Sequence, residues 1–439
     1  MTALPVLQRE APALRAHPSK LFVEVTTRCN LRCAMCPREA PGRTIVDGDM
    51  TRETFARLAP AFPRLDALVL NGIGEPLLHP HLDRFVEEAR RAMPDSGWVG
   101  FQTNGQLLGP KRAEALAHAG VDRICISADA VAPDLFSKLR RGGRLDAIET
   151  ATAALDDASR RRGRPISVGL EFVVMRDNLH QLPELVRWAA RHHVGFVIAT
   201  HMLPYDAAMA HAAAFDPNTD RALQLYEEWN ARAEADGVDM GRYFEVFLKF
   251  HQAPEDRRVV EYVKQMVADG AAQGVSVHPG RLLDHDADLL SRVRASFQEA
   301  EEVARAEGVE LKLPATVPTR QRRCEFVEGG GAFVAWDGSV SPCYFVWHRY
   351  SCHVGGVAKH VRPMSFGNVA GDELLSVWNG GASRSFREGV VKYDFPFCYD
   401  CNVALCDYVE GEEFEQDCHV GTVPCGACLW CTGLFQCLQ

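Results

Sequence analysis

Three cysteines near the N-terminus constrain this chain more than any other feature. Residues 28–37 read RCNLRCAMCP, which gives Cys29, Cys33 and Cys36 the spacing C-x3-C-x2-C. Four thiolates close the coordination of a [4Fe–4S] cluster, so three leave one iron open. An open position is typical of a catalytic metal centre rather than a structural one. Two alternatives stand beside this interpretation: a structural zinc site with a distant fourth ligand such as His79, and unpaired thiols without metal.

Composition and charge narrow the class of protein. The chain has 439 residues, a length that suggests two or three domains, and a net charge of −10. That charge argues against a surface for nucleic acid or for an anionic membrane, so we expect neither partner. No apolar run approaches the roughly 18 residues of a membrane span, and residues 1–20 lack the apolar core of a signal peptide. We therefore predict a cytoplasmic protein, in which fifteen cysteines serve better as metal ligands than as disulfides.

Short apolar runs alternate with amphipathic helical segments between residues 21 and 205. The six runs are LFVEVTT (21–27), LDALVLNG (65–72), WVGFQTNG (98–105), RICISAD (123–129), ISVGLEFVV (166–174) and GFVIATHML (195–203). This alternation predicts the α/β class, with a parallel sheet and crossover helices, and six units fit a partial (β/α)6 barrel. Its active site is expected at the C-terminal ends of the strands. Cys125, inside the fourth run, is predicted to be a buried core residue.

The sequence pattern divides the chain into four parts. Residues 1–20 are an N-terminal extension, and residues 21–205 are the barrel. Residues 206–315 are rich in Ala, Glu, Asp and Arg and predict a helical insertion that ends in a last barrel strand, 308–315. These helices either bear on the substrate or only cover the barrel. Residues 316–439 begin with a predicted hairpin around Asp337-Gly338 and then become dense in cysteine, which indicates a small domain built around metal.

Short polar motifs follow three of the predicted strands. NGIGEP (71–76) ends the second strand, TNG (103–105) ends the third, and Ser127 and Asp129 end the fourth. Each motif alone is usually only a turn. In this order behind the cysteine motif, however, they resemble the radical S-adenosylmethionine superfamily, over residues 20–205. The cofactor-binding positions that the resemblance implies are Met35, Gly74, Glu75, Pro76, Thr103, Asn104, Ser127 and Asp129.

The resemblance also implies a reaction. In that superfamily the open iron binds the amino and carboxylate groups of the methionine moiety, and one electron breaks the sulfonium C–S bond. The product, a 5′-deoxyadenosyl radical, abstracts hydrogen from the substrate, and a reductant such as ferredoxin or flavodoxin is the implied electron donor. Glu75 would accept hydrogen bonds from the cofactor's ammonium group, and Ser127 and Asp129 would meet its carboxylate or ribose. Met35 departs from the aromatic residue often found at its position, so its contact with adenine would be a thioether one.

Eleven further cysteines follow residue 323. Cys324, Gly338 and Cys343 have the spacing C-x13-G-x4-C, which resembles the opening of SPASM, an auxiliary iron–sulfur domain, and residues 364–380 resemble its linker. CYDCNVALC (398–406) and the tail CGACLWCTGLFQC (425–437) depart from the usual SPASM spacing, and the tail resembles ferredoxin cluster loops. Structural zinc remains the alternative for any one group of four. The candidate auxiliary ligands are Cys324, Cys343, Cys352, Cys398, Cys401, Cys406, Cys418, Cys425, Cys428, Cys431 and Cys437.

We expect two auxiliary [4Fe–4S] clusters, with a third as the alternative. One would use Cys324 and Cys343, completed by Cys352 or a later cysteine. The second would use Cys398, Cys401 and Cys406, closed by Cys418 or by a tail cysteine. In the alternative, the tail quartet Cys425, Cys428, Cys431 and Cys437 holds a cluster of its own.

The sequence therefore predicts a radical S-adenosylmethionine enzyme with a SPASM-like domain. VWHRYSCHV (346–354) and the CLWCTGLFQC ending resemble one branch, the maturases of metalloenzymes that include tungsten-dependent oxidoreductases. The expected substrate is a peptide or protein, modified during maturation of a metalloenzyme or of a ribosomal peptide. A small metabolite is the alternative, and a non-catalytic iron–sulfur electron carrier is a third possibility. Four histidines are candidates for the substrate pocket, although each is more often a surface or hydrogen-bonded residue: His201, His251, His278 and His285.

Overall fold

Six parallel strands form the frame of the molecule, for which the computed structural model describes residues 11–401, 406, 411 and 416–439. The first ten residues of the expected N-terminal extension lie outside the described residues. The strands are β1 (Lys20–Val23), β3 (Ala67–Val69), β4 (Trp98–Thr103), β5 (Arg123–Ser127), β7 (Ser167–Val174) and β8 (Phe196–His201), and each pairs in parallel with the next. Each coincides with one of the six apolar runs of the sequence, except that β1 begins one residue before its run, at Lys20. The predicted α/β fold with a partial barrel is confirmed.

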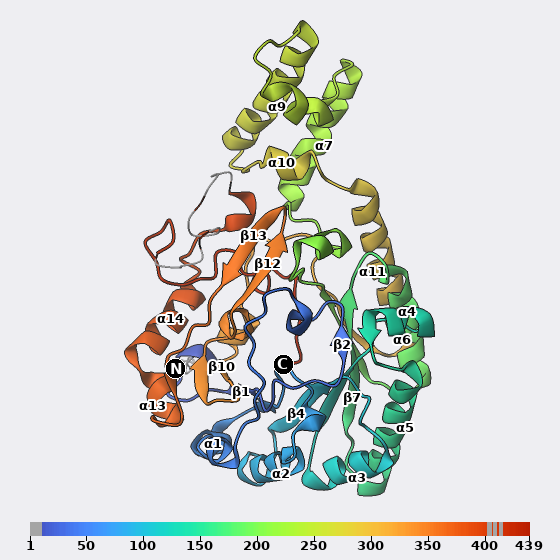
Figure 1. Cartoon of the computed structure of the whole chain (residues 1–439), viewed down its shortest axis with the longest axis vertical. Coiled ribbons are helices and arrows are strands. Elements are labelled where there is room, and N and C mark those ends of the chain that lie inside the picture. The colour runs from blue at the N-terminus through green and yellow to red at the C-terminus, as the bar shows by residue number, and fades with distance from the viewer. Residues whose placement is uncertain (1–10, 402–405, 407–410, 412–415) are drawn as a thin grey trace, which may run out of the picture.

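Crossover helices cover the outer face of this sheet (Figure 1). They are α1 (Arg52–Ala56), α2 (Leu82–Ala92), α3 (Pro110–Ala119), α4 (Pro133–Leu139), α5 (Leu145–Arg162) and α6 (Leu182–Arg191). In α2 the buried residues Leu82, Phe85, Val86 and Ala89 recur at helical spacing, which turns one stripe toward the sheet. Helix α3 begins with Pro110 and is capped after Ala119 by Gly120, whose φ of +101° is the left-handed conformation that glycine adopts freely.

Both edges of the six-stranded frame are extended by later parts of the chain. Strand β9 (Glu310–Lys312) pairs in parallel with β8, as the predicted last barrel strand should. At the other edge, β10 (Gly331–Val334) pairs in parallel with β1 and continues into β11 (Ser339–Ser341) and β14 (Gly367–Asn368). The hairpin predicted around Asp337-Gly338 is therefore present, but it extends the barrel sheet rather than standing in a separate domain. An uncovered β1 would leave unpaired backbone groups along its edge, and β10 satisfies them.

The strands alternate their side chains between two cores. On β1, Leu21 and Val23 face the outer helices while Phe22 faces inward, and on β5 the inward residue is Cys125, which is fully buried as predicted. C-terminal residues fill the inner core: the Phe326 ring stacks on that of Phe22 with centroids 4.4 Å apart. The last residues of the chain lie inside the ring of strands in Figure 1, where the Gln436 amide donates to Thr200 on β8.

The helical insertion divides into two parts. Helix α11 (Ala287–Glu307) packs on α6 and contributes its apolar face to the outer core of the barrel. The other helices are α7 (Asp220–Ala235), α8 (Tyr243–Phe247), α9 (Pro254–Ala272) and α10 (Pro279–Leu282). These four have an apolar cluster of their own, and Figure 1 shows α7 and α9 projecting away from the barrel. The sequence left open whether these helices bear on the substrate or only cover the barrel. Only α11 covers the barrel.

The C-terminal region adds a hairpin and three helices. Strands β12 (Tyr350–Val354) and β13 (Val357–Val361) form the hairpin, and the helices are α12 (Glu325–Glu328), α13 (Leu374–Asn379) and α14 (Gly381–Lys392). A separate pair, β2 (Arg32–Cys33) and β6 (Arg140–Arg141), lies at the cysteine motif. Among the described residues, no helix combines the length and the apolar character needed to cross a lipid bilayer.

Candidate active site

The cysteine motif follows β1 at the C-terminal edge of the sheet. Cys33 lies in the short strand β2, directly opposite Arg140 of β6, and the Ala34 amide donates to the Leu139 carbonyl. All three thiols are partly exposed. Burial raises the pKa of each, to about 12 for Cys36. Because a coordinating thiol is deprotonated by its metal, iron would overcome this burial cost.

The GEP turn packs against the backbone just before the first cysteine. A side chain at Gly74 would clash with the carbonyl oxygens of Thr26 and Arg28, and the Glu75 amide donates to the Arg28 carbonyl at 2.7 Å. Gly72 is equally tight, because a side chain there would clash with Glu24. Only glycine allows this close approach of two backbone segments. The glycines therefore hold the GEP turn directly against the backbone that leads into the cysteine motif.

Glu75 connects the ends of two strands. It is 2% exposed, and its carboxylate accepts from the Leu77 amide at 3.0 Å, from Thr103 Oγ1 at 2.7 Å and from the Asn104 amide at 2.7 Å. Burial raises its pKa, and the bonds from Asn104, Thr103 and Leu77 oppose that shift. A carboxylate offers about four acceptor positions, so one remains for the ammonium group that the sequence predicts as its partner. Glu75 therefore has a structural role that the motif did not reveal.

The TNG motif reaches the cysteines through Asn104. Its Nδ2 donates to Asn30 Oδ1 at 2.8 Å and lies 3.8 Å from the Cys29 sulfur. Asn104 is 6% exposed, whereas Cys29 is partly exposed and Asn30 is exposed, so this contact lies at the border between the core and solvent. The second and third strand ends thus converge on the first cysteine.

Asp129 faces an arginine that the sequence did not single out. Its Oδ1 accepts from the Val173 amide at 2.8 Å, and its Oδ2 lies 2.7 Å from Arg140 Nε, as an ion pair. Asp129 has no exposed surface. Burial alone would lower the pKa of Arg140, but Asp129 and the Cys33 thiol outweigh it and raise the pKa. Arg140 Nη1 lies 3.9 Å from the Cys33 sulfur, so it is Arg140 rather than Asp129 that borders the cysteine motif.

Met35 lies in a cluster of methionines. It is 9% exposed and packs with Met175, Met202 and Leu139, and Cys33 borders the same cluster. The thioether surface expected to contact adenine therefore contains three methionines rather than Met35 alone. Their polarizable sulfurs suit an aromatic ring such as adenine.

Ser127 contacts Glu171, a second residue that the sequence did not single out. It bonds to Glu171 on β7, and burial raises the pKa of Glu171 to about 7 against the opposing effects of Arg140, Gln102 and Ser127. From Gln102 the polar chain continues, because Asn71 Nδ2 donates to Gln102 Oε1 at 2.6 Å. Tyr344 in turn donates to Asn71 Oδ1 at 2.7 Å. This chain of hydrogen bonds crosses the inner face of the sheet, from the side of Arg140 to the C-terminal region.

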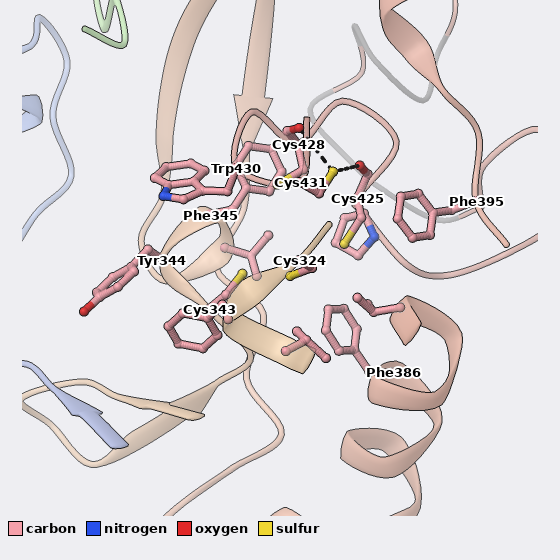
Figure 2. Close-up of a pocket in the computed structure, with 15 residues that line it drawn as sticks. Cys324, Cys343, Tyr344, Phe345, Phe386, Phe395, Cys425, Cys428, Trp430 and Cys431 are labelled. Carbon is pink, nitrogen blue, oxygen red and sulfur yellow. Dashed lines mark hydrogen bonds between the residues drawn. The ribbon is translucent and has the colours of Figure 1, made fainter. Parts of the chain in front are cut away.

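Five C-terminal cysteines surround one apolar cavity, shown in Figure 2. We call them the hairpin–tail group, and they are Cys324, Cys343, Cys425, Cys428 and Cys431. Phe386 and Phe395 also line the cavity. The tail cysteines therefore return to the two that open the SPASM-like pattern, an arrangement that the linear order of the sequence did not indicate.

A second set of four cysteines, the 398–418 group, consists of Cys398, Cys401, Cys406 and Cys418. Burial raises the pKa of Cys398 to about 12, and the other three thiols raise it further, while Lys359 lowers it. The expectation that Cys398, Cys401 and Cys406 share one cluster, closed by Cys418 or by a tail cysteine, stays a prediction. Parts of the loops between them lie outside the described residues.

Two cysteines belong to neither group. Cys352 is fully buried in an apolar cluster with Leu203 and Leu429 and is not among the residues that line the cavity of the hairpin–tail group. Of the two expectations for completing the cluster of Cys324 and Cys343, Cys352 or a later cysteine, only later cysteines line this cavity. Cys437 accepts from Trp430 Nε1 at 3.1 Å and has Glu171 and Cys343 among its charged neighbours. Among the described residues, no three His, Cys, Asp or Glu side chains converge as ligands of one metal ion would. Cluster ligands are arranged differently, because each thiolate binds its own iron.

The four candidate histidines do not share one pocket. His201 is 1% exposed, its Nε2 donates to the Ala315 carbonyl at 3.0 Å, and burial lowers its pKa to about 4. His278 caps α10, and His251 is exposed. His285 pairs with Asp216 and lines a groove of about 830 Å³ between the insertion and the β12–β13 hairpin. Only His285 of the four lines this groove.

A family model for the radical SAM superfamily matches residues 23–189 of this chain. The chain is a radical S-adenosylmethionine enzyme. A second model, for the SPASM iron–sulfur cluster-binding domain, matches residues 324–402. The resemblances inferred from the sequence are thereby confirmed, and so are the cofactors of this radical SAM enzyme: S-adenosylmethionine, a [4Fe–4S] cluster and auxiliary iron–sulfur clusters. The tail cysteines from Cys425 onward lie beyond both matched ranges.

Individual relatives of this radical SAM enzyme fall into two kinds. The tungsten-containing aldehyde ferredoxin oxidoreductase cofactor-modifying protein of Pyrococcus furiosus is 27% identical over 95% of this chain and 96% of its own length. The GTP 3′,8-cyclase of Pelotomaculum thermopropionicum is 38% identical, but over only 31% of this chain and 42% of that protein. Among solved structures, Streptococcus suis SuiB bound to S-adenosylmethionine aligns over 91% of this chain and 73% of that one, with 13% identity and a TM-score of 0.48.

Proposed function

We propose that this radical SAM enzyme acts on a peptide or protein during the maturation of a metalloenzyme. The observation that carries the proposal is the end-to-end similarity to the Pyrococcus furiosus cofactor-modifying protein, which extends over the insertion and the Cys-rich tail. Similarity to the GTP cyclase is confined to less than half of that protein. A small metabolite is the second candidate, because the cyclase shares the radical chemistry and its name gives GTP as the substrate.

In this proposal Cys29, Cys33 and Cys36 hold the cluster with the open iron. When bound there, reduced cluster and S-adenosylmethionine together supply a 5′-deoxyadenosyl radical that abstracts hydrogen from the substrate. Glu75 and Asn104 fix the GEP and TNG turns against the cysteine motif and present the remaining carboxylate position to the cofactor's ammonium group. Arg140, held by Asp129, offers a positive charge beside Cys33, where a carboxylate would bind favourably.

The groove beside the insertion is the proposed entry for the substrate. The turn η6 (Ala207–Ala212) separates it from the cysteine motif, since Met209 packs against the methionine cluster while His211 lines the groove. The groove carries both charges, with Arg176 paired to Asp286 at 2.7 Å and Arg281 nearby. Such an open, polar lining suits a polypeptide segment. We accordingly assign residues 21–205 to the radical core, 206–315 to substrate access and 316–439 to the auxiliary clusters.

Two auxiliary clusters are proposed, one for each cysteine group. Four of the five hairpin–tail cysteines supply the first and the 398–418 group supplies the second, so one hairpin–tail cysteine is left without a cluster together with Cys352 and Cys437. With the radical-site cluster, this gives about twelve irons per chain at four per cluster. Anaerobic reconstitution followed by iron, sulfide and zinc analysis tests the assignment. A value near sixteen without zinc would restore the third cluster, and a value near eight with zinc would make one group a structural zinc site.

The substrate class is tested by competing candidates under identical conditions. Reduced, reconstituted protein is mixed with S-adenosylmethionine and either a purified cofactor-free tungsten oxidoreductase polypeptide or GTP. Formation of 5′-deoxyadenosine is followed together with the mass of the polypeptide. We expect the polypeptide to increase the rate and to change in mass, and GTP to do neither. Stimulation by GTP alone would favour the metabolite, and a reduced protein that forms no 5′-deoxyadenosine with any partner would favour a simple electron carrier. Ferredoxin or flavodoxin, the proposed physiological reductants, should replace dithionite.

A further inference from the structure

Lys359 on β13 is a buried lysine close to many cysteines. It is 8% exposed, which is rare for a lysine unless it is paired. Its Nζ donates to the Ala427 carbonyl at 3.0 Å and lies 5.1 Å from the centroid of the Tyr399 ring. Across the β12–β13 hairpin its direct partner is Cys352. One carbonyl bond and one ring contact are little compensation for burying an ammonium group.

The two contacts of Lys359 come from different cysteine groups. Ala427 directly precedes Cys428 of the hairpin–tail group, and Tyr399 directly follows Cys398 of the 398–418 group. The two segments also touch each other, because the Cys398 amide donates to the Gly426 carbonyl at 3.0 Å. Lys359 therefore lies where the two groups meet.

Two opposing effects act on the pKa of Lys359. Burial lowers the pKa of Lys359, while the Cys352, Cys398 and Cys428 thiols oppose that shift and the positive Arg281 adds to it. Arg281 donates to the Tyr399 carbonyl at 2.9 Å, on the side of the 398–418 group. Clusters bound by thiolates are anionic, so with iron in place both groups would give the buried ammonium the negative partners that it lacks among the described residues.

We infer that Lys359 is a positive charge shared by the two auxiliary clusters, which raises the reduction potential of both. The inference rests on the proposed division of the cysteines into two cluster-binding groups. Reduction adds one electron to an anionic cluster, and a nearby cation stabilises the more negative, reduced form, with no bond or proton transferred. Lys359 would therefore set the reduction potentials through its charge, without contact to substrate or S-adenosylmethionine.

The test compares variants that keep or remove the charge. In a full-length chain with Cys29, Cys33 and Cys36 replaced by alanine, the auxiliary clusters alone give electron paramagnetic resonance signals. Anaerobic redox titrations are run on this protein and on its Lys359→Gln, Lys359→Met and Lys359→Arg variants. Lys138→Met is the matched control, because Lys138, in helix α4, is exposed and pairs with Asp177.

We expect both neutral variants to disfavour reduction of the two clusters by about tenfold or more, a fall of ~59 mV for one electron. Lys359→Arg and Lys138→Met should stay near the parent value. Unchanged potentials in neutral variants that retain their iron would overturn the inference. Loss of iron in both neutral variants, with iron retained in Lys359→Arg, would also overturn it, because Lys359 would then assemble the clusters rather than set their potentials. A parent protein without auxiliary iron would instead refute the proposed cysteine groups, before any lysine variant is compared.

Discussion

Replacing Glu75 with glutamine separates two roles of one buried carboxylate. In the native protein Oε1 accepts from Leu77 and Thr103, and Oε2 accepts from the Asn104 amide. Glutamine keeps one oxygen for the first two donors, but its NH2 group then faces the Asn104 N–H. Leaving that buried donor unsatisfied should cost about 1–3 kcal/mol of folding free energy, partly offset because a neutral group is easier to bury.

The same substitution should weaken the cofactor. Loss of a charge-assisted bond to the ammonium group costs about 1.5–3 kcal/mol, which raises the dissociation constant of S-adenosylmethionine tenfold or more. Binding is read from the perturbation of the reduced-cluster spectrum, and stability from anaerobic urea unfolding. Glu307→Gln, at the exposed end of α11, is the control for both. An unchanged dissociation constant would limit Glu75 to the turn, and unchanged stability would refute the hydrogen-bond reasoning itself.

Three further substitutions test other parts of the site. Gly74→Ala should displace the GEP turn, lowering stability by about 1–3 kcal/mol and abolishing cofactor binding, whereas Gly381→Ala, with nothing within 4 Å of its added carbon, should do neither. Arg140→Met should lower the free energy of urea unfolding by about 3–5 kcal/mol, because it leaves Asp129 buried without its cation. Adding Asp129→Asn should recover part of this loss, and a double variant whose stability loss equals the sum of the two single losses would contradict the pairing. Glu171→Gln should remove a pH dependence. The folded pKa near 7 lies above the ordinary 4.5, so the native state holds the extra proton and stability falls as pH rises from about 4.5 to 7, by at most ~3 kcal/mol. The stability of the variant should therefore fall less over this range, and identical pH profiles would show that Glu171 does not titrate there.

The sequence was informative where local pattern and chemistry agree. Alternating apolar runs predicted all six parallel strands, because each strand must bury both faces between helices and an inner core. The GEP and TNG motifs were found because they follow the cysteine motif in the order of the resembled family, and the structure adds the reason for Gly74, where a side chain would clash with backbone carbonyls. Their common target, the segment just before and at Cys29, follows from the rule that parallel strand ends meet at one edge.

Other features depend on contacts that no local pattern encodes. Arg140 reaches Cys33 through a two-residue strand pair, which is too short to leave a periodic signal. Glu171 is one polar residue in an apolar run, and the pairing of β7 with β5 places it beside Ser127 and within reach of Gln102. The tail cysteines return to Cys324 across about a hundred residues, so ligand order along the chain does not give their order in space. The edge pairing of β10 with β1 likewise joins distant segments.

The most direct test of the account is cleavage of S-adenosylmethionine by two matched proteins. Wild-type protein and a variant with Cys29, Cys33 and Cys36 all replaced by alanine are reconstituted anaerobically, assayed for iron and reduced with dithionite. The wild type should form 5′-deoxyadenosine and methionine. The variant should form neither, while it loses about four irons of one cluster and keeps those of the auxiliary groups. Undiminished formation of 5′-deoxyadenosine by the triple variant would contradict the assignment of the open iron to these three cysteines.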